Sequence, residues 1–567
     1  MSNNQPIDFS ALAQLLFPHV TLTPAQLEEK YPPRALREGE KITRFAPSPT
    51  GYVHFGGMYQ VLIDERLAHL SGGRVYLRIE DTDTKREVAD AAQGLIRTLA
   101  HYGIHFDEGA DTDESGNICD RGEYGPYQQS RRAEIYHVYA KQLVAQGHAY
   151  PVFSTDEELQ KALAADKKTE NKTKDWEAQA DARRAQKLAD RTFTLEQVQS
   201  ALARGEHFVL RLWADGDPEK KIPFTDLVKG KLEIPENDED FVLLKSDGIP
   251  TYHFAHAVDD HLMGTTHVVR GEEWLPSLSK HLMLFRFLGF RAPKYLHTAQ
   301  IMRLDENGNK KKLSKRDMGA KMEDFDRMGY EPVSVMEYLM TLLNSNYEEW
   351  RAQNPDQPYT AFPFSIKKMS PSGCLFDFDK LSDVAKNTLA KMDAAQVYDG
   401  LHTWAKEYAP DFDKKLQDRD YALQILSIGR GGKKPRKDYG TYQQVMEYMA
   451  LFYDDTFRVL DRIDPKFPVS DVKKALSAFA DSYAPGDDQN TWFEKIKAIA
   501  RDLGYADDMK AYKANPDSYP GNVGDISMFL RIAVTGKLAS PDMYAVMQII
   551  GKERVISRIR AYLQTLD

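Results

Sequence analysis

Cysteine is nearly absent from this chain: its 567 residues include two cysteines, Cys119 and Cys374. Two cysteines so far apart make no disulfide framework, and they cannot supply a cysteine-rich zinc site. Apolar runs long enough to cross a bilayer are lacking as well, and the first residues, MSNNQPIDFS, do not have the basic-then-apolar layout of a signal peptide. We therefore expect a cytoplasmic protein with no structural zinc and no membrane partner.

An excess of positive charge is also lacking, because the formal net charge is -10. Contacts with nucleic acid would have to come from local basic patches instead of a global positive field. The hydrophobic content of 42% and the charged content of 28% are ordinary for a globular protein. The length allows three or more structural units.

Residues 42–70 have the pattern of a strand, a glycine-containing turn and an amphipathic helix that we expect over 58–70. Backbone N–H groups and the positive end of the dipole at a helix N-terminus favour a phosphate. Gly56 and Gly57 would let the phosphate approach the backbone, since a Cβ would hold it away. His54 is placed to donate to it. Taken alone, a histidine before two glycines is more often a plain turn.

Three further segments carry groups that suit a ligand site. Glu80 follows a strand expected over 74–79, and carboxylates at that end of a strand lie where open α/β sheets bind ligands. The segment 250–261 has the composition of a metal site, with three histidines and two aspartates. Lys312 and Lys315 stand three apart in a lysine-rich loop, where ammonium charges suit phosphate oxygens. A solvated turn is the alternative for the first and the last of these segments.

Together these segments resemble the class I aminoacyl-tRNA synthetases, and specifically their glutamyl branch. The string RFAPSPTGYVHFGG (44–57) is similar to the first signature of the class, with Gly57 in its last place. KLSKR (312–316) is similar to the second signature, the Lys-Met-Ser-Lys-Ser loop. RIEDTD (78–83) and PTYHFAHAVDDHLMGTTHVVRGEEW (250–274) also match the family. The resemblance makes 250–261 the wall of an amino-acid pocket and not a metal cage.

The resemblance implies a role for each site residue. Positive charge at His54, Lys312 and Lys315 would stabilise the reacting phosphate, so these are the expected catalytic residues. The expected ATP-binding set is His54, Gly56, Gly57, Lys312, Ser314 and Lys315. The expected glutamate-binding set is Arg44, Ser48, Glu80, Tyr252 and Arg270. In the second set the two arginines would face a carboxylate, because a guanidinium presents two donors in a plane, and Glu80 would face the α-ammonium group.

The activity that this resemblance implies is that of a glutamate–tRNA ligase. ATP would activate L-glutamate to glutamyl-adenylate, and the glutamyl group would pass to the 3'-terminal ribose of tRNA(Glu). Mg²⁺ would travel with ATP, and the family normally needs bound tRNA before it activates glutamate. Two alternatives remain: an enzyme of relaxed specificity that also charges tRNA(Gln), and a non-catalytic tRNA-binding homologue. A glutaminyl enzyme would carry a Pro-Glu-Pro-type turn in the first signature.

The expected fold is an α/β Rossmann-type catalytic domain that is split by an acceptor-end-binding insertion and followed by an all-α anticodon-binding region. We expect a monomer. The expected bounds are an N-terminal extension at 1–40, catalytic halves at 41–120 and 241–325, the insertion at 121–240, a stem-contact domain at 326–400 and the helical anticodon-binding region at 401–567. Basic residues in a flexible loop of the last region suit a nucleic-acid backbone, although a solubilising loop would look the same. They are Arg430, Lys433, Lys434, Arg436 and Lys437.

Overall fold

The computed structural model describes residues 7–49, 51–82, 90–153, 190–314, 317–432 and 434–566. The chain divides into two compact units. The first unit comprises Met1–Asp324 and Leu339–Asp377, and the second comprises Phe325–Tyr338 and Phe378–Asp567. This division does not test the six domain bounds expected from the sequence, which stay predictions.

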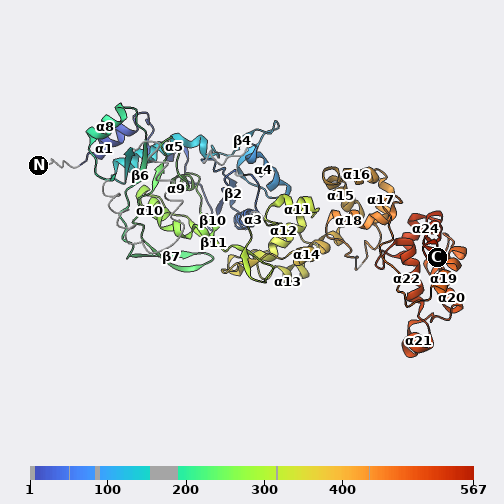
Figure 1. Cartoon of the computed structure of the whole chain (residues 1–567). Coiled ribbons are helices and arrows are strands. Elements are labelled where there is room, and N and C mark those ends of the chain that lie inside the picture. The colour runs from blue at the N-terminus through green and yellow to red at the C-terminus, as the bar shows by residue number, and fades with distance from the viewer. Residues whose placement is uncertain are drawn as a thin grey trace. The chain divides into compact units, whose positions relative to one another are not determined.

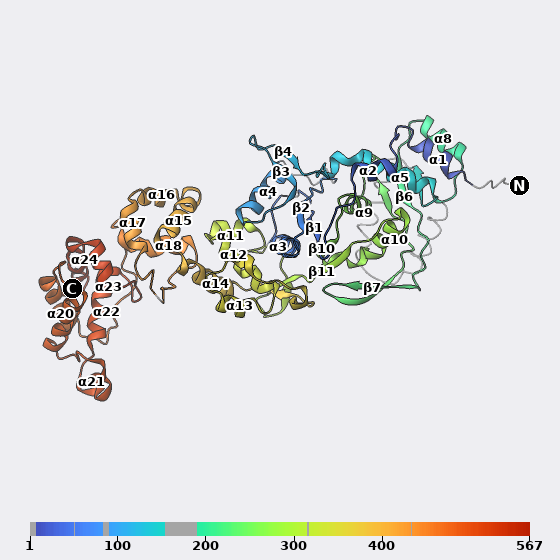
Figure 2. The ribbon, with the colours of Figure 1, turned by 180° about the vertical axis from the view of Figure 1, so that it is seen from behind.

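Parallel strands form the centre of the first unit (Figures 1 and 2). The strands are β1 (Ile42–Phe45), β2 (Arg74–Leu77), β3 (Glu108–Thr112), β10 (His267–Gly271) and β11 (Lys294–Thr298). β1, β2 and β3 pair in parallel, as do β10 and β11. β10 lies beside β1, where the N–H of Thr266 donates to the carbonyl of Ile42 at 3.0 Å. Every residue of β1 and β10 is buried, as expected for parallel strands covered on both faces.

Helix α3 (Phe55–His69) connects β1 to β2 and packs on β1, β2 and β10. It begins three residues before the expected start, because His54 takes an extended conformation (φ -80°, ψ 150°) and the two glycines form the first turn. A glycine is needed between this helix and β2. A Cβ on Gly73 would lie 1.9 Å from the carbonyl oxygen of Lys41, so only glycine fits beside the start of β1.

The other elements of the first unit surround this centre. β4 (Ile118–Arg121) pairs antiparallel with β3, and the remaining strands form small mixed or antiparallel sheets. Those strands are β5 (Ala149–Phe153), β6 (Phe208–Leu212), β7 (Lys221–Asp226), β8 (Gly230–Pro235), β9 (Val242–Leu244), β12 (Ile301–Leu304), β13 (Lys310–Lys312) and β14 (Cys374–Leu375). The helices are α1 (Phe9–Leu16), α2 (Pro24–Lys30), α4 (Ala91–His101), α5 (Ala133–Ala145), α8 (Leu195–Ala203), α9 (Tyr252–Leu262), α10 (Leu278–Leu288) and α13 (Tyr347–Gln353).

The N-terminal segment packs on the first unit through buried contacts. Helices α1 and α2 both contact α5. Arg34 donates to both carboxylate oxygens of Glu108, at 2.7 and 2.8 Å, and its Nε donates to the carbonyl of Met263 at 2.7 Å. The paired guanidinium lowers the pKa of Glu108 to about 2, against the opposing effect of burial.

The described residues of the second unit contain helices and no strands. The sequence therefore correctly predicts a helical C-terminal region. α11 (Met322–Met328) and α12 (Pro332–Leu343) each cross a boundary between the units. All but one of the other helices share one apolar core. They are α14 (Phe378–Lys391), α15 (Ala394–Tyr408), α16 (Pro410–Asp413), α17 (Arg419–Leu426), α18 (Tyr442–Met449), α19 (Val469–Ser482), α20 (Gln489–Asp502), α22 (Val523–Thr535), α23 (Met543–Ile550) and α24 (Lys552–Gln564). The exception is α21 (Met509–Ala514), which has no buried residue. Among all described residues, no helix has the length and apolar character needed to span a membrane.

Candidate active site

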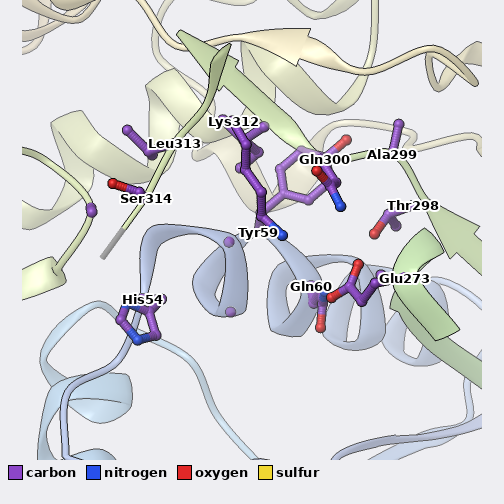
Figure 3. A pocket seen from close by; sticks show the side chains of 15 residues that line it. His54, Tyr59, Gln60, Glu273, Thr298, Ala299, Gln300, Lys312, Leu313 and Ser314 are labelled. Carbon is purple, nitrogen blue, oxygen red and sulfur yellow. The ribbon is translucent and has the colours of Figure 1, made fainter. Parts of the chain in front are cut away.

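A cavity of about 280 Å³ brings the two predicted signature motifs together (Figure 3). Every residue predicted for ATP lines it except Lys315, which lies outside the described residues. Gly271 and Glu273, which follow Arg270 in the chain, line it from another side. The cavity therefore joins the start of α3, the end of β10 and the lysine loop.

The N-terminus of α3 faces this cavity, which Gly56 and Gly57 line. The N–H of Phe55 donates to the carbonyl of Ala320 at 2.9 Å, and the side chain of His54 does not cap the helix. Gly56 and Gly57 follow in the first turn, where backbone N–H groups have no acceptor within the helix. A Cβ on Gly56 would meet no atom within 4 Å. Backbone donors at the positive end of a 15-residue helix favour an anion.

Lys312 extends into the cavity from β13 towards α3 (Figure 3). β13 pairs antiparallel with β12, and this pairing sets Lys312 opposite Met302. Asp317 holds the loop after β13: it accepts from the N–H of Ser314 at 2.7 Å and from its hydroxyl at 2.8 Å. Arg303 of β12 binds the same carboxylate at 2.7 Å. The Ser314 hydroxyl thus donates within the loop, which leaves its oxygen lone pairs for another partner.

A buried cluster of ion pairs surrounds Asp260 on α9. Nε of Arg44 donates to its two carboxylate oxygens at 3.1 and 3.3 Å, and Nη1 of Arg78 donates to it at 2.6 Å. Arg78 also donates from Nη2 to Oε1 of Glu80 at 3.0 Å. Burial opposes the charge on Arg44, but Asp260 outweighs it and raises the pKa of Arg44. Arg44 therefore stays cationic, and its Nη2 donates to no described residue.

The neighbouring Asp259 is equally well paired. It accepts from Arg132 at 2.7 Å, from Gln129 at 2.9 Å and from the Tyr136 hydroxyl at 2.8 Å. The aspartates of the segment 250–261 thus bind arginines. Among the described residues, no group of three or more histidine, cysteine, aspartate or glutamate side chains is arranged to hold a metal ion.

Glu80 is a buried carboxylate with one oxygen in use. Burial raises its pKa from 4.5 to about 7, although Arg78 and Arg44 oppose the shift. Its Oε2 accepts no hydrogen bond from a described residue. The carboxylate is therefore poised to ionise when a cation approaches.

Arg270 on β10 is 4% exposed and differs from the other buried arginines in having neutral partners. Its Nε donates to Nε2 of His297 at 2.9 Å, and its Nη1 donates to Nδ1 of His281 at the same distance. The guanidinium also lies 4.6 Å from the centre of the Tyr295 ring. Its Nη2 is buried and has no hydrogen-bond partner among the described residues. A buried cationic donor without an acceptor is costly unless a ligand supplies one.

Tyr252 and Ser48, the other residues predicted to bind glutamate, differ in their surroundings. Tyr252 is half-buried, with its ring 4.3 Å from that of Trp274. Burial raises its pKa, and Arg270, Glu80 and Arg44 also act on it, which places these four predicted residues in one neighbourhood. Ser48 is exposed, and it forms no hydrogen bond with that cluster within the described part of the chain.

The basic loop of the second unit is partly tied down. Arg430 donates to the carbonyls of Leu389 and Met392 at 2.6 and 2.7 Å, and Arg436 binds Asp438 with two hydrogen bonds. Lys433 lies outside the described residues. Lys434 and Lys437 are exposed. Among the predicted cations of this loop that the structure describes, Lys434 and Lys437 are therefore the most accessible to a partner.

Reasoning from the sequence did not find the ion pairs that hold the cluster. Arg78 and Asp260 belong to strings already recognised, RIEDTD and the segment 250–274, but nothing in their spacing shows that they meet. Their separation of 182 positions makes the contact a property of the fold. Glu273 and Gln60 also line the cavity. Glu273 carried no sequence signal beyond its place in the segment 250–274, and Gln60 lies outside all the recognised strings.

Comparison with known protein families identifies the class of the catalytic domain. Residues 41–381 match the family "tRNA synthetases class I (E and Q), catalytic domain", and residues 517–563 match an "Anticodon binding domain". The fold is thus that of a class I tRNA synthetase.

The relatives define the branch. A glutamate–tRNA ligase of Acetivibrio thermocellus is 47% identical over 560 residues, covering 98% of this chain and 100% of the relative. One of Sorangium cellulosum is 41% identical over 95% of this chain and 98% of the relative. The crystal structure of a glutamate tRNA ligase from Elizabethkingia meningosepticum, in complex with its amino acid, superposes with a TM-score of 0.69 at 26% identity, covering 93% of this chain and 100% of that one. The chain belongs to the glutamate–tRNA ligases.

Proposed function

We propose that the chain activates L-glutamate with ATP to glutamyl-adenylate and transfers the glutamyl group to the 3'-terminal ribose of tRNA(Glu). The specificity for glutamate is inferred from the charges around Arg270. Arg44, Arg78 and Arg132 each contact Asp259 or Asp260, whereas Arg270 forms no ion pair with a described carboxylate. A buried guanidinium without a counter-ion favours a ligand that brings a carboxylate. The neutral amide of glutamine would leave that charge uncompensated.

The proposed amino-acid site pairs each charge of glutamate with an opposite charge. Arg270, and Arg44 through its Nη2, would bind carboxylate oxygens, and Tyr252 and Ser48 would add neutral hydrogen bonds. Glu80 would bind the α-ammonium group through its free Oε2. Burial of these groups strengthens each charge-assisted hydrogen bond, because little water competes for it.

Activation needs no nucleophile from the protein. The substrate carboxylate attacks the α-phosphorus of ATP, a bond forms between them, and pyrophosphate leaves with the electron pair of the broken P–O bond. Gly56 and Gly57 would bind phosphate oxygens through their N–H groups, and His54, Lys312 and Lys315 would stabilise the growing negative charge. The protein therefore acts by positioning and electrostatic stabilisation.

The cavity is compatible with the Mg²⁺ that accompanies ATP. Mg²⁺ prefers oxygen ligands and usually takes one or two carboxylates together with substrate phosphates. Glu273 and Thr298, which both line the cavity, offer such oxygens. When bound, Mg²⁺ would neutralise phosphate charge.

We propose that the rest of the chain binds tRNA. The match at 517–563 supports anticodon binding within 401–567, with the exposed Lys434 and Lys437 as contacts for the RNA backbone. By resemblance, 121–240 would be an insertion that splits a Rossmann-type domain and holds the acceptor end, and 326–400 would contact the stem. Free cysteines fit a reducing compartment, and we propose a cytoplasmic monomer.

Pyrophosphate exchange tests this proposal. The full chain is incubated with ATP, labelled pyrophosphate and either glutamate or glutamine, with and without tRNA(Glu) or tRNA(Gln). We expect exchange with glutamate that tRNA(Glu) stimulates, and none with glutamine. Exchange stimulated equally by tRNA(Gln) would indicate relaxed specificity, and no exchange under any condition would contradict the proposal.

A substitution tests the residue that carries the choice of substrate. Arg270→Lys keeps the positive charge but loses the planar pair of donors, so we expect a KM for glutamate raised about tenfold or more, while the KM for ATP stays unchanged. An unchanged KM for glutamate would remove Arg270 from the amino-acid site.

A further inference from the structure

The Arg270 side chain is held by neutral acceptors on both sides. A guanidinium carries only donors, so the two ring nitrogens that face it, Nε2 of His297 and Nδ1 of His281, must each carry a lone pair. Each histidine is then neutral, with its proton on the opposite nitrogen. The geometry thus fixes the tautomer of both rings.

Each of those outward protons has an acceptor. Nδ1–H of His297 donates to Oδ2 of Asp226 at 2.6 Å, and Asp226 accepts further from the N–H groups of Val228 and Lys229 at 2.9 and 2.8 Å. Nε2–H of His281 donates to Nδ1 of His253 at 2.9 Å. A continuous chain of hydrogen bonds therefore runs from β7 through β11 to Arg270, and onward through α10 to α9.

The surroundings keep both histidines neutral. His281 and His297 are fully buried, and burial lowers the pKa of each. His256, Arg270 and His253 lower the pKa of His281 further, and Asp260 opposes them. For His297, Asp226 opposes burial, and Arg270 and Lys229 reinforce it. Protonation of either ring would also place an N–H against a donor of Arg270.

We infer that His281 and His297 are positioning residues that fix the Arg270 guanidinium through two of its nitrogens, keep its positive charge uncompensated, and leave Nη2 for the carboxylate of the amino-acid substrate. A carboxylate in place of either ring would orient Arg270 equally well but would neutralise it. A neutral imidazole orients the Arg270 guanidinium and leaves its positive charge in place. The preference of the site for the acidic side chain of glutamate over the amide of glutamine therefore depends on His281 and His297. The inference rests on the proposed function, because it assigns Nη2 to glutamate.

Leucine and amide variants of the two histidines separate positioning from mere packing. His297→Leu and His281→Leu remove the acceptor. In His297→Gln the amide oxygen can occupy the place of Nε2, and in His281→Asn it can occupy the place of Nδ1. In tRNA-stimulated pyrophosphate exchange we expect each leucine variant to raise the KM for glutamate about tenfold or more with the KM for ATP within threefold. Each amide variant should restore most of the loss.

His267→Leu is the matched control, because His267 is a buried histidine on the same strand, β10, and bonds to Thr266 instead of Arg270. It should leave the KM for glutamate within threefold of the wild-type value. The inference is overturned if His281→Leu and His297→Leu also leave the KM for glutamate within threefold of the wild-type value, or if the KM for ATP rises together with that for glutamate. It is also overturned if the amide variants raise the KM for glutamate as much as the leucine variants.

Nuclear magnetic resonance of the wild-type chain labelled with ¹⁵N-histidine tests the geometry independently of activity. We expect a neutral ring with its proton on Nε2 for His281 and on Nδ1 for His297, with each signal assigned by its loss in the amide variant. An imidazolium or the opposite tautomer at either residue near pH 7 overturns the inference. Absence of exchange in the wild-type chain would instead refute the proposed function and leave the tautomer result standing.

Discussion

Asp260 accepts hydrogen bonds from Arg44 at 3.1 and 3.3 Å, although 216 positions of sequence separate the two residues. The contact joins α9 to β1, and Asp260 accepts from Arg78 of the segment that follows β2 at 2.6 Å as well. One carboxylate therefore compensates two buried cations. Both cations lie beside residues that we propose to bind the substrate.

Replacement of Asp260 by asparagine should destabilise the first unit strongly. Asp260→Asn leaves the buried guanidinium groups of Arg44 and Arg78 without their charge partner, which typically costs about 3–5 kcal/mol. We expect faster hydrogen exchange in the peptides that contain β1 and β2, measured by mass spectrometry on the full chain at increasing urea concentration.

The control for this substitution is Glu233→Gln. Glu233 is 75% exposed and pairs with Lys221 at 3.8 Å, so loss of its charge should cost less than about 1 kcal/mol. If both variants exchange at the wild-type rate, the Asp260 cluster does not stabilise the unit.

Lys312 should contribute to the chemical step because it extends into the cavity beside the start of α3. Lys312→Ala removes a cation from the proposed phosphate site, and we expect adenylate formation to fall about a hundredfold. Single-turnover formation of glutamyl-adenylate in the presence of tRNA measures this step directly.

Lys311→Ala provides the comparison, since neighbouring residues of a strand point to opposite faces and Lys311 does not line the cavity. We expect less than a threefold change for it. An equal loss in both variants would assign the effect to the general charge of the loop and not to the position of Lys312.

Motifs with a local cause could be predicted from the sequence. The helices at Phe9–Leu16 and Pro24–Lys30 are examples, because their apolar spacing and their capping residues, Asp8 and Thr23, are encoded nearby. The same holds for the turn and helix at the start of α3, where the two glycines and the helix are adjacent in sequence. Short-range signals of this kind also marked the lysine loop.

Contacts between distant segments could not be predicted in this way. Glu80 and Arg270 were assigned roles by resemblance, but their partners Arg78, His281 and His297 emerge only once strands and helices have packed. Tyr439 and Tyr442 illustrate the same limit. They follow the basic loop in the sequence, where exposed rings could stack on bases, yet both side chains are buried in the helical core. Burial of an aromatic ring depends on the fold around it.

The raised pKa of Glu80 predicts a pH dependence of glutamate binding. Below about pH 7 the buried carboxyl is mostly protonated and cannot pair with an ammonium group, so binding must release a proton. We expect the affinity for glutamate to rise with pH, up to about tenfold per pH unit, and to level off above about pH 7. The KM for glutamate in the exchange assay, measured from about pH 5.5 to about pH 8.5, reports it.

Glu80→Gln should abolish this rise of glutamate affinity with pH and should weaken glutamate binding at every pH. The same carboxyl has the opposite effect on stability: glutamate binding strengthens with pH, whereas the free energy of unfolding falls. Between pH 4.5 and about 7 the folded state keeps a proton that the unfolded state has released, so this group stabilises the fold at low pH and loses that effect as the pH rises through about 7. If the wild-type KM does not change with pH, the α-ammonium group does not bind at Glu80.

Gly56→Ala should separate folding from nucleotide binding. A Cβ at this position meets no atom within 4 Å, and alanine suits a helix better than glycine, so the free energy of unfolding should be unchanged or higher by up to about 1 kcal/mol. Gly56 lines the cavity, however, and a methyl group there would hold a phosphate away from the backbone donors. We therefore expect a KM for ATP raised about tenfold, with the KM for glutamate little changed.

Gly94→Ala is the matched control, because Gly94 is also a helical glycine, in α4, whose Cβ would make only an ordinary contact at 3.9 Å with Arg97 and which does not line the cavity. It should stabilise the chain by a similar amount and leave the KM for ATP at the wild-type value. Equal kinetics in the two variants would mean that ATP does not approach the first turn of α3. A loss of stability in Gly56→Ala alone would mean that the space in front of this turn is filled in the folded protein.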